Sequence, residues 1–266
     1  MLLHLVADFG VGDLAFAEVA QRLKRRLPQA ELVLTAVPPF ATLAAGFVSA
    51  QLSLNEAPPG TVVFHNVAPR RDDEGPRADN AGERLAAARL PGGGCVVGVN
   101  AGYAFSFFRQ AGLELRYVRA EAAGSQFRSR DVFPDAVAAV ARGEPGVLLG
   151  PVDPGAVPDV PEGRVAYVDG FGNLKTTWAA PSTFAPGSKV RVRVEGRERI
   201  AYASGGSFSV PAGTLAFAPG SSGWPLPGGG RVRFMELFLR GGSAAEAFGR
   251  PAVGAHVEVM SAAVPT

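Results

Sequence analysis

The sequence predicts an α/β N-terminal domain, with a mainly parallel sheet flanked by helices, followed by an all-β domain, either an antiparallel barrel or a sandwich. The first 150 residues alternate short apolar runs with stretches of helical periodicity, the order of a βαβ protein. Beyond a proline-rich stretch, short alternating runs separated by Gly/Pro turns are typical of antiparallel strands. The expected domains are therefore residues 1–150 and 164–266, joined by a proline-stiffened linker over residues 151–163.

The first βαβ unit carries the clearest pattern. Residues 2–7 are mostly apolar and suit an inner strand, and Asp13 can cap a helix over residues 14–27. Residues 31–35 then predict the second strand. The remaining expected elements of this domain are helices over residues 42–54 and 132–142 and strands over residues 61–64 and 95–99. Residues 70–93 are polar and rich in Gly and Pro, which predicts a long excursion.

Four alternating runs predict strands in the second domain. They are residues 164–168, 189–194, 231–239 and 255–259. Gly/Pro turns lie between them, which is typical of an antiparallel barrel or sandwich.

Composition favours a packed, intracellular protein. Of the 266 residues, 47% are hydrophobic and 19% are charged, which gives material for a core and argues against disorder. The net charge of +2 comes without a basic block, so nucleic acid is not an expected partner. Cys95 is the only cysteine, which predicts a reducing compartment, and we expect a cytoplasmic protein. No stretch predicts a signal peptide or a membrane span, and three scattered histidines predict no metal site.

A glycine turn follows the first strand. Residues 10–15 fit G-x-G-x-x-A, the fingerprint of dinucleotide binding, in which glycines let a pyrophosphate approach a helix N-terminus. Asp8 would place a carboxylate beside those phosphates, so a tight turn with a helix cap is the favoured alternative. Asp8 itself closes a buried strand, at the edge where α/β sheets bind ligands, and can accept both hydroxyls of a ribose. A second helix cap is the equal alternative for Asp8.

Two further segments carry polar residues beside aromatic ones. His65, expected on a loop beside Asn66, is either a catalytic base or a structural histidine. Arg130 and Asp131 are expected to pair and to cap the following helix.

The segment of residues 167–174 predicts a hairpin turn with several polar groups. Asp169 and Asn173 can hold the ammonium and carboxylate of an amino acid, and Phe171 can stack on an adenine. The alternative is a hairpin without any binding role.

Taken together, these segments resemble the family that contains S-adenosylmethionine hydrolases, fluorinase and chlorinase. Ala7–Asp13 resembles T-D-F-G-x-x-D, and Phe127–Phe133 resembles F-H-G-R-D-I-F. Val168–Thr177 resembles I-D-x-F-G-N-x-x-T-N, and Met235–Glu246 resembles L-E-I-A-V-N-x-G-S-A-A-E. These motifs occur in order and cover nearly the whole chain.

The resemblance implies a site for S-adenosylmethionine or adenosine, as substrate and without another cofactor. It implies that Asp8 holds the ribose diol, and that Asp169 and Asn173 contact the methionine portion. The substrate-binding residues that it implies are Asp8, Phe9, Asp13, Phe127, Asp169, Phe171, Asn173, Leu239 and Gly241. It also implies a homotrimer in which the second domain of one subunit completes the site of its neighbour.

The resemblance fails at the residues that activate water. The family Asp falls on Ala68 and the family His on Arg128, while the family Arg falls near Gly75 or Arg77. Ser129 replaces a family glycine, as a serine does in the fluorinating branch. The catalytic candidates are therefore His65, Arg70, Arg128 and Ser129, with arginines holding an anionic nucleophile.

Two functions are compatible with this pattern. In the first, the protein cleaves S-adenosylmethionine by nucleophilic attack at C5′, giving methionine and adenosine or a 5′-substituted adenosine; methionine leaves as a neutral thioether and needs no general acid. In the second, the protein binds adenosine or S-adenosylmethionine without turnover, since both the family Asp and His are missing.

Overall fold

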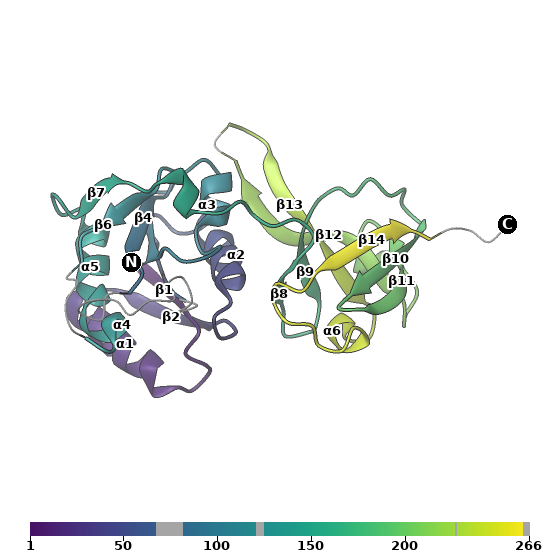
Figure 1. The fold of residues 1–266 in the computed structure, drawn as a ribbon, viewed down its shortest axis with the longest axis horizontal. Coiled ribbons are helices and arrows are strands. Elements are labelled where there is room, and N and C mark those ends of the chain that lie inside the picture. The colour runs from purple at the N-terminus through teal and green to yellow at the C-terminus, as the bar shows by residue number, and fades with distance from the viewer. Residues whose placement is uncertain (68–81, 121–124, 227, 263–266) are drawn as a thin grey trace. The chain divides into compact units, whose positions relative to one another are not determined.

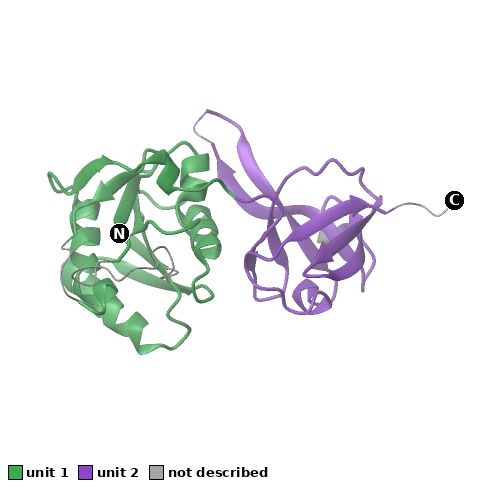
Figure 2. Ribbon diagram, in the orientation of Figure 1, with its two compact units in different colours: residues 1–160 green, residues 161–266 purple. Residues whose placement is uncertain are grey.

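The protein divides into two compact units, residues 1–160 and 161–266 (Figure 2). The structure is a computed structural model that describes residues 1–67, 82–120, 125–226 and 228–262. Each unit is built on its own sheet (Figure 1).

The sheet of the first unit is mixed. Its seven strands are β1 (Leu2–Ala7), β2 (Glu31–Ala36), β3 (Val62–Asn66), β4 (Leu85–Arg89), β5 (Cys95–Val99), β6 (Arg116–Val118) and β7 (Leu148–Pro151), in the spatial order β2-β1-β3-β5-β4-β6-β7. The pairs among β2, β1, β3 and β5 are parallel, whereas the pairs from β5 through β4 and β6 to β7 are antiparallel. The expectation of a mainly parallel sheet is therefore wrong for one half of the sheet. The excursion expected over residues 70–93 contains β4, a short alanine-rich strand without the usual β-branched signal.

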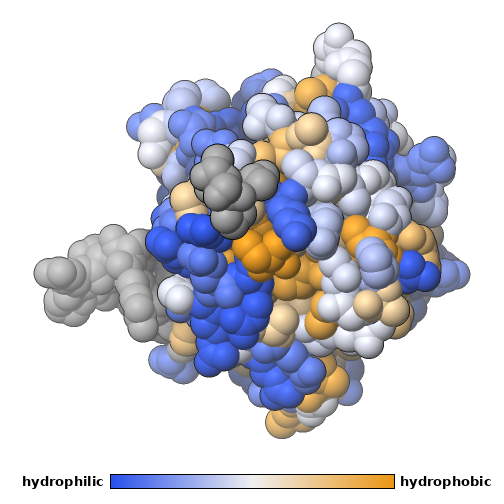
Figure 3. Space-filling model, turned by 90° about the vertical axis from the view of Figure 1, so that its right-hand side faces the viewer, coloured by the Kyte–Doolittle hydropathy of each residue, from blue (hydrophilic) through white to orange (hydrophobic). Residues whose placement is uncertain are grey.

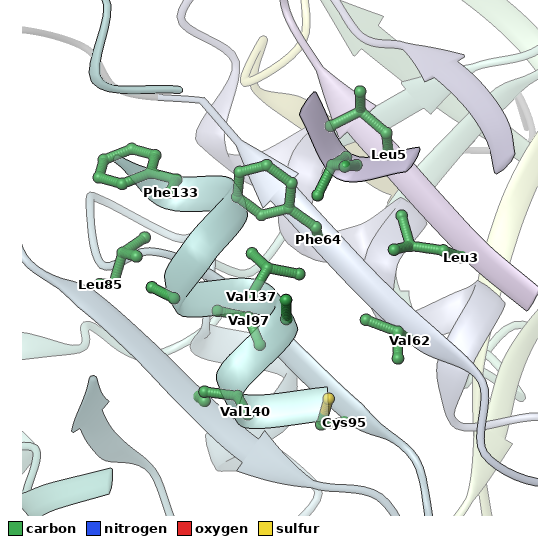
Figure 4. Close-up of a cluster of buried hydrophobic side chains, with 14 of the residues drawn as sticks. Leu3, Leu5, Val62, Phe64, Leu85, Cys95, Val97, Phe133, Val137 and Val140 are labelled. Atoms are coloured by element: carbon green, nitrogen blue, oxygen red, sulfur yellow. The ribbon is translucent and has the colours of Figure 1, made fainter. Parts of the chain in front are cut away.

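Helices lie on both faces of this sheet. The helices of the unit are α1 (Leu14–Arg26), α2 (Thr42–Ser53), α3 (Ser106–Gln110), α4 (Arg128–Asp131) and α5 (Phe133–Arg142), with a 3-10 turn, η2, at Pro154–Ala156. The amphipathic α1 and α5 lie on one face and the largely buried α2 on the other. The carboxylate of Asp13 accepts the Ala15 N–H at 2.7 Å and caps α1, as predicted. Figure 4 shows Phe133, Val137 and Val140 of α5 packed on Phe64 and Val97 of the sheet.

The capping expected of Asp131 is wrong. Helix α5 begins after Val132 without any side-chain cap, because Asp131 belongs to α4 and its carboxylate is bound by Arg130 instead. A proline in the first turn of α5 removes one unsatisfied N–H and so reduces the need for a cap.

The second unit is one curled sheet with mostly antiparallel pairs. Its strands are β8 (Val165–Val168), β9 (Leu174–Ala179), β10 (Lys189–Val194), β11 (Arg197–Ala203), β12 (Leu215–Pro225), β13 (Arg231–Leu239) and β14 (Val257–Ser261), in the spatial order β14-β10-β11-β12-β13-β9-β8. Only the β11–β12 pair is parallel among the described strand pairs of this sheet. A bridge between Arg164 and His256 links the two edges, so the sheet curls around its core as a barrel does.

The core of the second unit comes from the inward-facing residues of those strands. The alternation in β10 buries Val190, Val192 and Val194, while Arg191 and Arg193 lie on the outer face. A 3-10 turn, η3 (Ser207–Ser209), and a one-turn helix, α6 (Ala244–Ala247), complete the unit. Figure 3 shows one face of the molecule, on which hydrophobic patches lie between hydrophilic ones.

Candidate functional site

A first group of candidate residues lies where β1 ends. The Asp8 carboxylate accepts the backbone N–H of Phe40 at 2.8 Å, which ties the turn after β2 to the turn after β1. Phe40 has φ of 62°, a conformation that non-glycine residues rarely adopt, and its ring is half exposed. This corner therefore joins a carboxylate to the backbone of a residue with a half-exposed aromatic ring. Phe40 was not predicted from the sequence, because its contact with Asp8 joins two turns that are far apart in the chain.

Aromatic contacts bring a distant segment to the same corner. The ring of Phe9 lies edge-on to Phe127, with centroids 6.0 Å apart, and to Phe16 of α1, at 5.2 Å. Such edge-to-face pairs are favourable beyond the area that they bury. Phe127 comes directly before α4, so the aromatic triad joins the β1 turn, α1 and the segment of the resemblance around residues 127–133.

An ion-pair network holds that segment in place. Arg130 binds Asp131 through two hydrogen bonds of 2.7 and 3.0 Å and reaches Glu18 of α1 at 3.0 Å. The guanidinium also lies over the Phe127 ring, 5.2 Å from its centroid. The hydrogen bonds from Arg130 and then from Ser125 lower the pKa of Asp131 to about 2. The predicted Arg130–Asp131 pair is thus confirmed, and its partners fix Phe127 against α1.

The glycine turn after β1 is open. Gly10 and Gly12 have φ of 84° and 81°, and an added Cβ would meet no atom of the described residues within 4 Å at either position. Both glycines are therefore required by backbone conformation rather than by a close approach of other protein atoms. The Asp13 carboxylate at this turn is used as the cap of α1.

His65 lies in the core, and the expectation that it lies on a loop is wrong. It belongs to β3 and is 0% exposed, and neither of its ring nitrogens has a hydrogen-bond partner among the residues that the structure describes. Its ring packs against Phe105 at 4.6 Å and fills the space above Gly98 on β5, where an added Cβ would lie 2.2 Å from the imidazole. Burial lowers the pKa of His65 to about 3, because the charged imidazolium is poorly solvated there. A role of His65 as a catalytic base stays a prediction, and the burial of its ring argues against that role.

The other catalytic candidates are Arg128, Ser129 and Arg70. The Arg128 guanidinium donates to the backbone carbonyl of Glu83 at 3.1 Å and lies over the Phe133 ring, 4.9 Å from its centroid. Ser129 is buried on α4. Arg70 and the neighbouring Ala68 lie outside the described residues.

The second group of candidates forms the turn between β8 and β9. Asp169 Oδ1 accepts the backbone N–H groups of Phe171 and Asn173, each at 3.0 Å, and Oδ2 accepts the Asn173 side-chain amide at 3.0 Å. The carboxylate thus shapes its own turn. Phe171 at the tip is 82% exposed. The turn lines a hollow of about 420 Å³ together with Ser243 and Arg250.

A buried charge cluster, not found by the sequence analysis, lies behind that turn. Lys175 Nζ donates to both carboxylate oxygens of Glu236 at 3.0 Å and lies 3.8 Å from Asp169 Oδ2. Glu236 is 1% exposed and also accepts the Ser222 hydroxyl at 3.1 Å. A glutamate among the apolar residues of β13 was the signal, because a charged residue facing a core needs a partner.

Leu239 and Gly241 lie at the end of β13. Leu239 pairs with Leu215 of β12, and its carbonyl accepts the Gly242 N–H at 3.0 Å. The Arg240 N–H and carbonyl bind the 213–214 turn, at 3.1 and 2.8 Å. Gly241 has φ of 81°, which suits the turn into α6.

The described residues hold no group of three or more His, Cys, Asp or Glu side chains that could bind a metal ion. Within the described part of the chain, no helix is both long and apolar enough to cross a membrane. Contacts join Asp8, Phe9 and Phe127 in the first unit, and Asp169, Phe171 and Asn173 in the second.

Comparison with known proteins agrees with the motifs. The sequence model of the SAM hydroxide adenosyltransferase N-terminal domain matches residues 3–150. An uncharacterized conserved protein from Thermotoga maritima has a similar structure, with a TM-score of 0.74 and 21% identity, covering 97% of this chain and 100% of the other. A conserved hypothetical protein from Thermus thermophilus has a TM-score of 0.66 and 26% identity, covering 97% of this chain and 99% of the other. No curated protein matches the sequence.

Proposed function

The chain belongs to the SAM hydroxide adenosyltransferase family, and from that membership we propose that it binds S-adenosylmethionine and transfers the adenosyl group to a nucleophile at C5′. With water as nucleophile, a C5′–O bond forms while the C5′–S bond breaks. The electron pair of the broken bond moves to sulfur, methionine leaves as a neutral thioether, and water loses a proton. The products are adenosine, methionine and one proton.

The observation that carries this proposal is the corner at the end of β1. It combines a carboxylate, Asp8, with the aromatic rings of Phe9, Phe40 and Phe127, within the part of the chain that matches the family. A carboxylate is a strong acceptor for the two hydroxyls of a ribose, and aromatic rings suit the faces of a nucleoside. We propose that Asp8 holds the ribose diol and that Phe40 and Phe127 contact the nucleoside.

The second unit supplies the remaining proposed contacts. We propose that Phe171 stacks on the adenine, that backbone at Leu239 and Gly241 reads the adenine edge, and that the Asp169–Asn173 turn meets the methionine portion. Three hydrogen bonds to the Asp169 carboxylate hold this turn in one conformation, which supports a role in binding. We further propose that neighbouring subunits of a homotrimer combine the two groups into one site.

Incubation of the purified protein with S-adenosylmethionine tests the reaction. We expect adenosine and methionine to appear in equal amounts, above the rate in buffer alone, as measured by liquid chromatography. Chloride or fluoride in the buffer would give a 5′-halogenated adenosine if an anion is the nucleophile. The absence of every adenosyl product above the buffer rate would remove the enzymatic function.

A binding protein without turnover is the second candidate function, and two observations favour it. His65 has no exposed surface, and Arg128, at the position of the family His, is bound to the Glu83 carbonyl. Neither side chain is placed to take a proton from water. Calorimetric titration separates the candidates: binding of adenosine in a protein that releases no adenosyl product would establish this second function.

A further inference from the structure

Three charged side chains form a compact cluster behind the tip of the 169–173 turn. Lys175 follows that turn on β9 and lies directly opposite Glu236 of β13 in the antiparallel ladder. Its ammonium makes two hydrogen bonds to the Glu236 carboxylate and lies 3.8 Å from the Asp169 carboxylate. One lysine is thus shared between a carboxylate of the core and a carboxylate of the turn.

Glu236 is enclosed so closely that its charge is not screened by water. The strand β12 is bulged between Pro219 and Gly223, and Gly220 in that bulge lies against the Glu236 side chain. An added Cβ on Gly220 would lie 2.0 Å from Glu236 Oε1, so only glycine allows this contact. Ser222 from the same bulge supplies a third hydrogen bond. The carboxylate is therefore 1% exposed, and Lys175 supplies a neutralising charge at hydrogen-bond distance.

The charges of the cluster do not cancel. Asp169 and Glu236 each contribute −1 and Lys175 contributes +1, which leaves one negative charge. Glu236 is buried and Asp169 is 20% exposed, so the surplus charge is presented at the turn. Glu246 and Arg250, which line the same hollow, pair with each other at 3.1 Å and add no net charge.

We propose that Lys175 and Glu236 are positioning residues that set the charge of the 169–173 turn, so that the turn accepts a ligand carrying a positive group in preference to a neutral nucleoside. This inference rests on the proposed function and deepens it. S-adenosylmethionine bears a sulfonium, an ammonium and a carboxylate, with a net charge of +1, whereas adenosine is neutral. Neither positioning residue needs to touch the ligand, because a charge acts over several ångströms where water is excluded.

Variants that remove the ion pair with and without a change of net charge test this idea. Glu236→Gln brings the cluster to zero charge, whereas the double variant Lys175→Met/Glu236→Gln keeps it at −1, and both remove the ion pair. We expect the preference, the Kd for adenosine divided by the Kd for S-adenosylmethionine, to fall about fivefold in Glu236→Gln and to keep its wild-type value in the double variant. Isothermal titration calorimetry measures both dissociation constants.

Lys189→Met is the matched control, because Lys189 is a lysine of the same unit that lies exposed on β10. It is expected to leave the preference unchanged. A purely structural ion pair would change the preference in the double variant as much as in Glu236→Gln, since both variants remove the pair, and that result would overturn the inference.

The outcomes for the wild type separate this inference from the proposed function. A wild-type protein that binds both ligands, with a preference that Glu236→Gln leaves unchanged, overturns only the inference. A wild-type protein that binds adenosine and not S-adenosylmethionine has a nucleoside site whose turn does not accept the positive group. That result also overturns the inference. A wild-type protein that binds neither ligand overturns the proposed function and the inference together.

Discussion

The elements proposed to hold a ligand and the positions proposed for catalysis are built in opposite ways. Asp8 and the 169–173 turn carry carboxylates whose hydrogen bonds shape the local backbone, with exposed aromatic rings at Phe40 and Phe171. His65 is instead enclosed in the core, and Arg128 is turned onto a backbone carbonyl and a phenylalanine ring. The binding side is thus preorganised and open, while the described catalytic candidates are committed to packing.

This contrast predicts that binding and turnover depend on different residues of the fold. A carboxylate that shapes a turn contributes to the stability of the fold whether or not a reaction follows. A residue that activates water contributes only to the reaction. We therefore expect substitution of His65 to change the free energy of unfolding more than the affinity for adenosine. Substitution of Asp8 or Phe171 is expected to change the affinity for adenosine more than the free energy of unfolding.

The largest effect is expected from the core histidine under acid conditions. The pKa of His65 is about 3 in the folded protein and 6.5 in a model imidazole, so the unfolded chain binds the proton first as the pH falls. Stability from the neutral ring is complete above pH 6.5 and is lost down to pH 3, by about 4 kcal/mol. His65→Leu is expected to remove that part of the pH dependence of the free energy of unfolding, measured by urea titration from pH 7 to pH 3.5.

His256→Leu is the control for this experiment. His256 is exposed beside Glu258, at 3.5 Å, and its replacement is expected to keep the acid sensitivity of the wild type. An acid response that is the same with and without His65 would show that the imidazole reaches solvent. In that case the contrast between the buried catalytic candidates and the exposed binding candidates would not hold for His65.

The second prediction restores the family residues on the catalytic side. Ala68→Asp combined with Arg128→His places an acid–base pair where the family has one, and such groups typically contribute 10²-fold or more in rate. We expect adenosine release from S-adenosylmethionine to rise about 100-fold relative to the wild type, as followed by liquid chromatography. Arg128→Ala alone, which removes the bond to the Glu83 carbonyl without adding a base, is expected to change the rate less than threefold. An unchanged rate in the double variant would show that the binding side is altered as well.

The third prediction concerns the proposed ribose contact. Asp8→Ala removes a charged acceptor, and hydrogen bonds to charged groups are worth about 1.5–3 kcal/mol each. We expect the Kd for adenosine to rise about 30-fold in calorimetric titration. Asp135→Ala, which removes an exposed carboxylate from α5, is expected to leave this Kd unchanged. Equal affinities of the wild type and Asp8→Ala would show that the ribose is held elsewhere.

Much of the fold followed from local patterns, and the exceptions have physical reasons. The alternation in β10 and β13 and the cap at Asp13 were predicted, because each depends on neighbours in sequence. Strand β4 was missed because its Leu-Ala-Ala-Ala-Arg sequence has low strand propensity and is held by its partners, β5 and β6. Its antiparallel pairing also made the sheet mixed.

The candidate site shows the same division. The residues of the 169–173 turn were found because an Asp, a Phe, a Gly and an Asn lie within five positions. Phe40 and the Lys175–Glu236 pair were not found, since each depends on a contact between strands or turns far apart in the sequence. His65 was misplaced because a histidine next to an asparagine looks polar locally, whereas Gly98 on the neighbouring strand makes room for its ring.

The smallest effect is expected at Phe171, and it tests whether the open side binds at all. The ring is 82% exposed, so Phe171→Ala removes little packing and is expected to change the free energy of unfolding by less than about 0.5 kcal/mol. Base–aromatic stacking is worth about 1–3 kcal/mol, so the Kd for adenosine is expected to rise about tenfold. Phe208→Ala is the matched control, because Phe208 is 86% exposed in the same unit. Both variants remove an exposed ring at little structural cost. A loss of affinity confined to Phe171→Ala would therefore place the adenine at the 169–173 turn, whereas equal losses in the two variants would show that neither ring stacks on the adenine.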